Sequence, residues 1–312
     1  MVLTLNPVII NQHFTRHRAT AIGLAFAGAS VGSIILPPAT EALIQQYGLR
    51  GCFLLLGAIN LQGLVGSFLY LPPVWINRTS PASEPLTESE FSFPELSLKE
   101  KIRARLGFLA SPIFAVLCIN YTSFFICYIA FSMTLVDFAK DRGISELDAT
   151  FCISAFSVGD LGGRLASGWV SDLGFVKRRS MLVGGLLAMG ILMGLAPRTG
   201  SYGMLVALAA ILGLLTGSVI VLFPVLMTEY LGLDHLPMCL GFSGFVMGLA
   251  SLCLPNLIGL CRDVAGSYDH LYHTLSVLAI FSASLWSYHP LRRLYYKLKE
   301  SLCSSTRNTN LT

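Results

Sequence analysis

The chain has 312 residues, of which 54% are hydrophobic and only 12% are charged, whereas a soluble domain carries about 25% charged residues. This composition, with a mean hydropathy of +0.68, excludes an ordinary soluble protein and predicts an integral, multi-pass membrane protein. The formal net charge of +4 is small and arises from the loops, so it does not indicate a nucleic-acid-binding protein.

Eight stretches of about 20 apolar residues predict membrane-spanning helices, because lipid offers no hydrogen-bond partner to an open backbone. In chain order they cover residues 19–45, 51–71, 108–138, 145–170, 180–197, 202–227, 238–261 and 271–289. A further apolar stretch, residues 1–11, is too short to cross a bilayer alone.

The distribution of lysine and arginine between the loops predicts the orientation of these helices. If the loops alternate, 15 of the 21 basic residues lie on one side and five on the other, while Arg164 lies inside a span. We expect the richer side to be cytoplasmic. It includes the long central loop, residues 74–107, and the C-terminal tail, residues 290–312.

The span 145–170 contains two full charges, Asp160 and Arg164. Because they are four residues apart, they share one face of the helix. Each charge at the bilayer centre costs about 2.5–3.5 kcal/mol on insertion scales, and pairing offsets part of that cost. Two interpretations remain open. The pair either fixes helix packing, or forms a site in which Arg164 receives a substrate carboxylate and Asp160 takes up a proton.

The end of this span and the loop after it read GWVSDLGFVKRR, and carry Gly168, Asp172 and the basic run Lys177, Arg178 and Arg179. A glycine lets helices approach closely, an aspartate caps or pairs, and basic residues anchor to the inner membrane surface. The pattern resembles the cytoplasmic loop motif of the major facilitator superfamily. Together with a central loop followed by six helices, it implies a two-half secondary transporter. An ordinary turn with cytoplasmic basic residues is the alternative.

A more specific resemblance lies in the first predicted span and the residues before it. The matching positions are His13, Phe14, Arg16, His17, Arg18, Ala21, Gly23, Ala25, Ala27 and Gly28. They are similar to the signature that leads into the fifth helix of the monocarboxylate transporter family, with departures at His13 and His17. The stretch YGLRG, residues 47–51, is also similar to that family. We expect Gly23, Ala27, Gly28 and Gly32 to form a stripe that packs closely against another helix.

The resemblance implies an all-α membrane protein with a truncated major facilitator fold. Asn6 and Pro7 are similar to a pair inside the fourth helix of the family, so we expect a partial helix 4 followed by helices 5–12, without the first three helices. The expected domains are residues 1–73, the remainder of the N-terminal half; 74–107, the central cytoplasmic loop; 108–289, the six-helix C-terminal half; and 290–312, the cytoplasmic tail.

The resemblance also implies a function, namely proton-coupled secondary transport of small monocarboxylates across the plasma membrane. It assigns substrate and proton binding to residues at the positions of Asp160 and Arg164, and it links Phe223 to substrate size. Some relatives need a single-span accessory chaperone as a partner. Two alternatives remain open: transport of aromatic amino acids, thyroid hormone or creatine-like solutes without proton coupling, and a truncated membrane protein that does not transport.

No sequence motif indicates an enzyme, since the chain has no Walker loop, no GxSxG and no cluster of metal-ligand residues. We therefore expect no enzymatic activity, no cofactor and no metal. The expected partners are a small organic anion, a proton and the lipid bilayer, with no nucleic acid.

Overall fold

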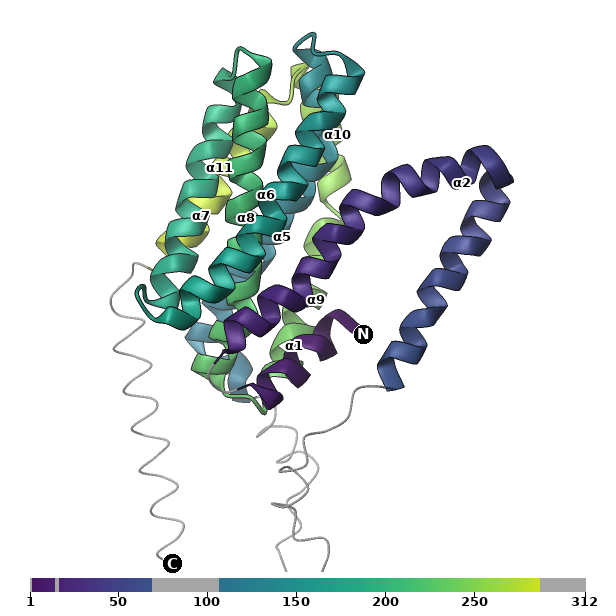
Figure 1. Ribbon diagram of the computed structural model, residues 1–312. Helices are drawn as coiled ribbons and strands as arrows, with labels where there is room; N and C mark the ends of the chain where they lie inside the picture. Colours follow the sequence, from purple (N-terminus) through teal and green to yellow (C-terminus); the bar gives the residue numbers. More distant parts are fainter. Residues whose placement is uncertain (1, 15–16, 69–106, 287–312) are drawn as a thin grey trace, which may run out of the picture.

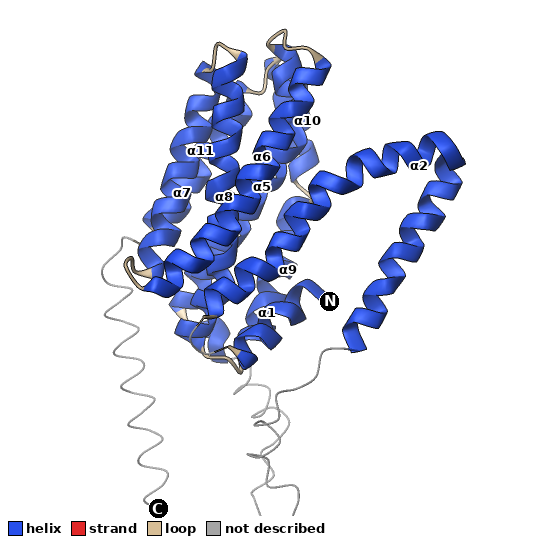
Figure 2. Ribbon diagram, viewed as in Figure 1, coloured by secondary structure: helices blue, strands red, loops and turns tan. Residues whose placement is uncertain are grey.

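The computed structural model describes residues 2–14, 17–68 and 107–286. Throughout these residues the chain forms α-helices and two short 3-10 turns, with no β-strand (Figure 2). The predicted all-α architecture is therefore confirmed. The predictions for Arg16, for nearly all of the central loop 74–107 and for the tail 290–312 lie outside the described residues.

The first two helices come before the central loop. Helix α1, Val2–His13, has 12 residues. At about 1.5 Å per residue it is too short to cross a hydrocarbon core of about 30 Å, as predicted. Helix α2, Arg18–Phe68, turns sharply at Gly48, whose φ of 67° favours glycine. The turn divides α2 into two arms that match the predicted spans 19–45 and 51–71, and only the first arm lies against the other helices (Figure 1).

The helices after the central loop form an up-and-down bundle (Figure 1). In order they are η1 Gly107–Ala110, α5 Pro112–Asp141, α6 Glu146–Leu173, α7 Arg178–Leu195, η2 Ala196–Arg198, α8 Tyr202–Leu231, α9 Leu236–Ser251, α10 Leu254–Ala265 and α11 Asp269–Ser284. Each span predicted after the central loop falls on one of these helices, except that 238–261 is divided between α9 and α10. The break lies at Leu252 and Cys253, and Pro255 is the second residue of the next helix.

Six segments of the described residues are long and apolar enough to cross a membrane. They are Arg18–Leu36, Ala42–Gly63, Pro112–Asp141, Arg178–Arg198, Tyr202–Leu231 and Leu236–Asp263. Helices α6 and α11 are missing from this set although the sequence predicts spans there. The described part of α11 has only 16 residues, and α6 contains Asp160, Arg164 and several glycine and serine residues. Both helices nevertheless lie inside the bundle, α6 between α2 and α8.

Helices α6 and α8 form the closest helix pair in the bundle. Gly159 and Gly163 of α6 face α8, and Gly213 and Gly217 of α8 face α6. At each of the four, an added Cβ would lie 2.0–2.1 Å from a backbone carbonyl oxygen of the opposing helix. Only glycine permits this approach, which is typical of helix packing in membranes.

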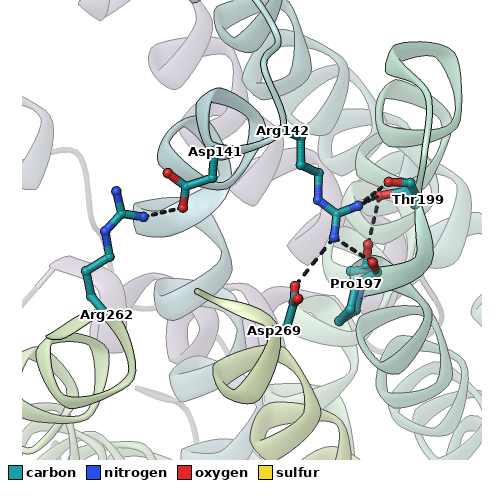
Figure 3. Close-up of polar contacts among 7 residues, drawn as sticks. Asp141, Arg142, Pro197, Thr199, Arg262 and Asp269 are labelled. Atoms are coloured by element: carbon teal, nitrogen blue, oxygen red, sulfur yellow. Dashed lines mark hydrogen bonds and ion pairs between the residues drawn. The ribbon is translucent and has the colours of Figure 1, made fainter. Parts of the chain in front are cut away.

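The bundle has two ends with different polar contacts. The basic end carries the start of α2 and the α6–α7 turn with Lys177, Arg178 and Arg179. The opposite end carries the α5–α6, α7–α8 and α10–α11 turns. Here Arg262 of α10 forms an ion pair with Asp141 at the end of α5 (Figure 3).

Arg142 links the three turns at the opposite end (Figure 3). Its Nη1 donates to the carbonyl oxygen of Thr199 and, over 2.8 Å, to the Thr199 hydroxyl. Its Nη2 donates to the carbonyl oxygen of Pro197 over 2.6 Å and lies 3.4 Å from Asp269 Oδ1. The guanidinium also lies 4.2 Å from the centre of the Phe138 ring. A single cation thus joins the ends of α5, η2 and α11.

Candidate functional site

The structure brings together the two charges inside the bundle. Asp160 and Arg164 lie one turn apart on α6, with 2.8 Å between Asp160 Oδ2 and Arg164 Nη2. Their side chains are only 5% and 6% exposed, respectively. Replacing both members of a buried ion pair with apolar side chains of similar volume is often neutral or stabilising, so burial of the pair is weak evidence for a purely structural role.

Both charged side chains also contact α2. The Ser30 hydroxyl donates to Asp160 Oδ2 over 2.6 Å, and Arg164 Nη1 donates to the carbonyl oxygen of Phe26 over 2.6 Å. Sequence reasoning missed both partners. Ser30, a buried polar residue in an apolar arm, offered a weak signal, whereas a backbone carbonyl at Phe26 offered none. The pair therefore lies between helices from opposite sides of the central loop.

Two polar atoms of this site have no hydrogen-bond partner among the described residues: Asp160 Oδ1 and Arg164 Nε, both buried. Buried polar atoms without partners are rare, since each costs about 1–3 kcal/mol. The pair therefore has one carboxylate oxygen and one guanidinium N–H to which no described residue is hydrogen-bonded.

Helix α8 packs against the backbone of α6 at the charged pair. A Cβ at Gly217 would lie 2.1 Å from the Asp160 carbonyl oxygen and 2.9 Å from the Arg164 backbone nitrogen. A Cβ at Gly213 would lie 3.0 Å from the Asp160 backbone nitrogen. The backbone of α6 is therefore fixed against α8 at the level of the two charges, while their side chains contact α2.

The first arm of α2 approaches α6 closely only over its first turns. A Cβ at Gly23 would lie 2.4 Å from the Arg164 carbonyl oxygen, and one at Gly168 would lie 2.7 Å from the Ala19 carbonyl oxygen. Around Gly28 nothing described lies within 4 Å of an added Cβ, and at Gly32 only Leu36 of the same helix does. The predicted stripe is thus correct at Gly23 and wrong at Gly28 and Gly32. The buried face of this arm runs through Gly23, Ala27 and Ser30, whereas Gly28 is exposed on another face of the helix.

The loop motif at the basic end joins α6 to the start of α2. Asp172 Oδ2 accepts hydrogen bonds from the Thr20 backbone nitrogen (2.8 Å) and hydroxyl (2.7 Å), and Oδ1 accepts from the Ala19 nitrogen over 3.3 Å. The carboxylate therefore caps the N-terminus of α2, where the helix dipole favours a negative charge. Asp172 also pairs with Arg178 over 3.2 Å. Both predicted roles of Asp172, capping and pairing, are confirmed.

The basic run of the motif makes more protein contacts than we expected. Besides Asp172, the Arg178 guanidinium contacts the Ser171 hydroxyl over 3.2 Å. Arg179 donates to the carbonyl oxygen of Trp286 and lies 5.1 Å from the centre of its ring. Only Lys177 is exposed without such a contact among the described residues. Two of the three bases thus join helix ends instead of extending toward the membrane surface.

The remaining signature residues lie at the basic end, apart from the charged pair. Phe14 is 49% exposed, and Arg18 Nε donates to its carbonyl oxygen over 2.9 Å. These contacts shape the turn between α1 and α2. The described residues hold no group of three or more His, Cys, Asp or Glu side chains that could bind a metal ion.

Phe223 lies on α8 and is fully buried. Its ring centre is 5.2 Å from that of Tyr121 and 5.4 Å from that of Phe124, both on α5. The structure therefore places Phe223 within the core of the bundle, behind two aromatic side chains. Its expected link to substrate size stays a prediction.

Comparison with known proteins identifies the family. The sequence model of the Major Facilitator Superfamily matches residues 1–136 and 113–300. The chain belongs to the major facilitator superfamily. Members of this superfamily are membrane transporters rather than enzymes, which agrees with the expectation from the sequence.

Individual relatives lie within one branch of the superfamily. Mouse "Monocarboxylate transporter 11" is 30% identical over 271 residues, which cover 83% of this chain and 57% of the relative. Mouse "Monocarboxylate transporter 12" is 27% identical over 308 residues, 91% of this chain and 62% of the relative. Human "Monocarboxylate transporter 2" is 29% identical over 290 residues, 89% and 60%. The predicted resemblance is confirmed, and the chain spans between 57% and 62% of the length of these three relatives.

Proposed function

We propose that this chain acts in the secondary transport of small monocarboxylates across the plasma membrane, coupled to protons. The observation that carries the proposal is the buried ion pair of Asp160 and Arg164, in which Asp160 Oδ1 and Arg164 Nε have no hydrogen-bond partner in the part of the chain that the structure describes. The names of the three relatives support the same class of substrate.

In this proposal Arg164 binds the substrate carboxylate. A guanidinium offers parallel N–H groups that match the two oxygens of a carboxylate. At present Arg164 Nη2 is held by Asp160 and Nη1 by the Phe26 carbonyl. Protonation of Asp160 removes its negative charge, so that the carboxylate of the substrate can replace it beside Arg164. A proton and an anion then enter the site together, and the net charge of the buried site does not change.

Replacement of Asp160 by the substrate carboxylate beside Arg164 would also couple binding to a movement of α2 relative to α6. Ser30 and Phe26 of α2 hold the charged pair of α6, and these two contacts join helices on either side of the central loop. A substrate carboxylate on Arg164 competes with the Phe26 carbonyl, and a proton on Asp160 weakens its hydrogen bond from Ser30. Loading the site would therefore loosen α2 from α6, as alternation between two conformations requires.

Residues farther from the pair also have roles in the proposed transport. We place the basic end of the bundle on the cytoplasmic side, in line with the uneven distribution of lysine and arginine. Asp172 then acts as a cytoplasmic contact between α6 and α2. Phe223 would influence substrate size through the aromatic side chains that cover it. A single-span accessory chaperone remains a proposed partner.

Arg164→Lys is the direct test, because it keeps the charge and removes the planar fork. The purified chain is reconstituted into liposomes, and uptake of labelled lactate or pyruvate is driven by an inward proton gradient. We expect a loss of about tenfold or more, the scale of one charge-assisted contact. Arg198→Lys, at an exposed arginine of η2, is the matched control and should transport normally. Undiminished uptake by Arg164→Lys would refute the proposed role.

A further inference from the structure

One face of α5 carries aromatic side chains that are only partly buried. Tyr121, Phe125 and Tyr128 recur at intervals of four and three residues and so share this face. By contrast, Phe124 of the same helix and Phe223 of α8 are fully buried. The half-buried rings are therefore the aromatic groups of this region that a solute can reach without repacking the core.

Tyr128 is the member of this face that lies beside the charged pair. Its ring centre is 6.0 Å from that of Phe156, which precedes Asp160 by one turn of α6. If the carboxylate of a solute bound Arg164, the organic part of the solute would therefore lie near the Tyr128 ring.

Neighbouring rings hold the Tyr128 side chain in place. It is nearly parallel to Phe124, with ring centres 6.3 Å apart and an interplanar angle of 7°, and it lies edge-on to Phe125 at 6.4 Å. Aromatic contacts of this kind stabilise the position of each ring. Tyr128 thus forms a rigid wall, which is what size selection requires.

Phe223, by contrast, is not accessible to a solute. Its ring is 0% exposed and lies behind Tyr121 and Phe124. A solute could touch Phe223 only after those two side chains had moved. Its effect on a bound solute would therefore be transmitted through α5.

We infer that Tyr128 contacts the organic part of the substrate and limits its size, and that Phe223 acts only through the α5 aromatic residues. This inference rests on the proposed function, because it assumes that the carboxylate binds Arg164. It makes α5, rather than α8, the helix that selects among carboxylates of different bulk. The mechanism is steric: the guanidinium fixes one end of the solute, and the ring restricts the space for the other.

The inference is tested by binding to the 312-residue chain in lipid nanodiscs, with labelled pyruvate as the probe and phenylpyruvate as the competitor. These two acids differ by a single phenyl group. Tyr128→Ala should raise the affinity for phenylpyruvate relative to pyruvate by about tenfold or more, because it opens a space the size of a ring. Tyr128→Phe keeps the wall and should keep the wild-type ratio.

Two further variants test whether the change in affinity ratio is specific to Tyr128. Phe223→Leu should change the affinity ratio less than Tyr128→Ala does. Met133→Ala, on an exposed side of α5, should leave the ratio unchanged. An unchanged ratio in Tyr128→Ala, or a larger change in Phe223→Leu, would overturn the inference. If Tyr128→Ala does not fold, Tyr128→Leu replaces it and should change the ratio in the same direction.

The same experiment distinguishes this inference from the proposed function. If the wild type binds neither acid, or if Arg164→Lys binds both as tightly as the wild type, the carboxylate site itself is refuted, and the role of Tyr128 with it. If Arg164→Lys loses both acids but Tyr128→Ala keeps the wild-type ratio, the site stands and only the inference about Tyr128 fails.

Discussion

The Ser30 hydroxyl lies 2.6 Å from Asp160 Oδ2, so a residue that precedes the central loop donates a hydrogen bond to a carboxylate that follows it. A hydrogen bond to a charged group contributes about 1.5–3 kcal/mol to stability. Ser30→Ala removes this bond and with it one of the contacts that join α2 to α6, so it should destabilise the protein by about that amount.

The control for this prediction is Ser33→Ala on the same arm of α2. The Ser33 hydroxyl donates to the Ser30 carbonyl oxygen within its own helix, over 2.8 Å. Its loss should cost less stability, because this bond does not join α2 to α6. The measurement is thermal unfolding of both variants in detergent at matched amounts of protein. Equal Tm values would contradict a stabilising contact between Ser30 and Asp160.

Gly217→Ala adds a methyl group where α8 packs against the α6 backbone at the charged pair, and it should displace the pair. The added Cβ would lie 2.1 Å from the Asp160 carbonyl oxygen, so α6 and α8 would have to separate. We expect a destabilisation of about 1–3 kcal/mol, the range for overpacked cores, together with weaker binding of the acid. Gly203→Ala lies on the same helix and has nothing described within 4 Å of its Cβ. Thermal unfolding in detergent should separate the two variants, and equal Tm values would argue against the close packing of α6 and α8.

Asp172→Asn tests the contact at the basic end. The variant keeps an oxygen that can accept from Thr20 but loses the charge that favours both the α2 N-terminus and Arg178. The expected loss of stability is about 1 kcal/mol, and it should shrink at high salt because part of the effect is electrostatic. Asp234→Asn, at an exposed aspartate between α8 and α9, is the control. If the two variants have equal Tm values at low salt, the carboxylate does not stabilise the start of α2.

Arg142→Ala tests the junction at the opposite end. It removes the donor to the carbonyl oxygens of Pro197 and Thr199 and the partner of Asp269. We expect a destabilisation of about 2 kcal/mol, because hydrogen bonds from a charged donor are lost. Arg198→Ala, an exposed neighbour in η2, should cost little. Thermal unfolding of both variants decides whether Arg142 joins the three turns.

The sequence could predict the charged pair but not its environment. Two charges in an apolar span stand out, and a spacing of four residues places them on one helical face. Ser30 and Phe26 become partners only because α2 crosses α6, which is a tertiary contact. For the same reason the small-residue stripe held at Gly23 and failed at Gly28, which is exposed while Ala27 and Ser30 of the same arm are buried.

The burial of the aromatic side chains is a second feature that the sequence could not predict. Phe223 was singled out by resemblance, whereas its burial behind Tyr121 and Phe124 depends on how α5 and α8 are rotated toward each other. Periodicity in an almost wholly apolar helix cannot indicate that rotation, since every face is apolar. The sequence thus predicted the helices and the break at Gly48, but not the break between α9 and α10, nor which aromatic side chains remain accessible.

The most direct test of the central claim exchanges the two charges. The double variant Asp160→Arg with Arg164→Asp keeps one buried cation and one buried anion four residues apart on α6. If the pair binds substrate and proton, the variant should fold and insert but should not take up labelled lactate or pyruvate under an inward proton gradient, because the fork no longer lies where the carboxylate binds. Full pH-driven uptake by the exchanged variant, at matched amounts of protein, would contradict the account and leave the pair with a structural role alone.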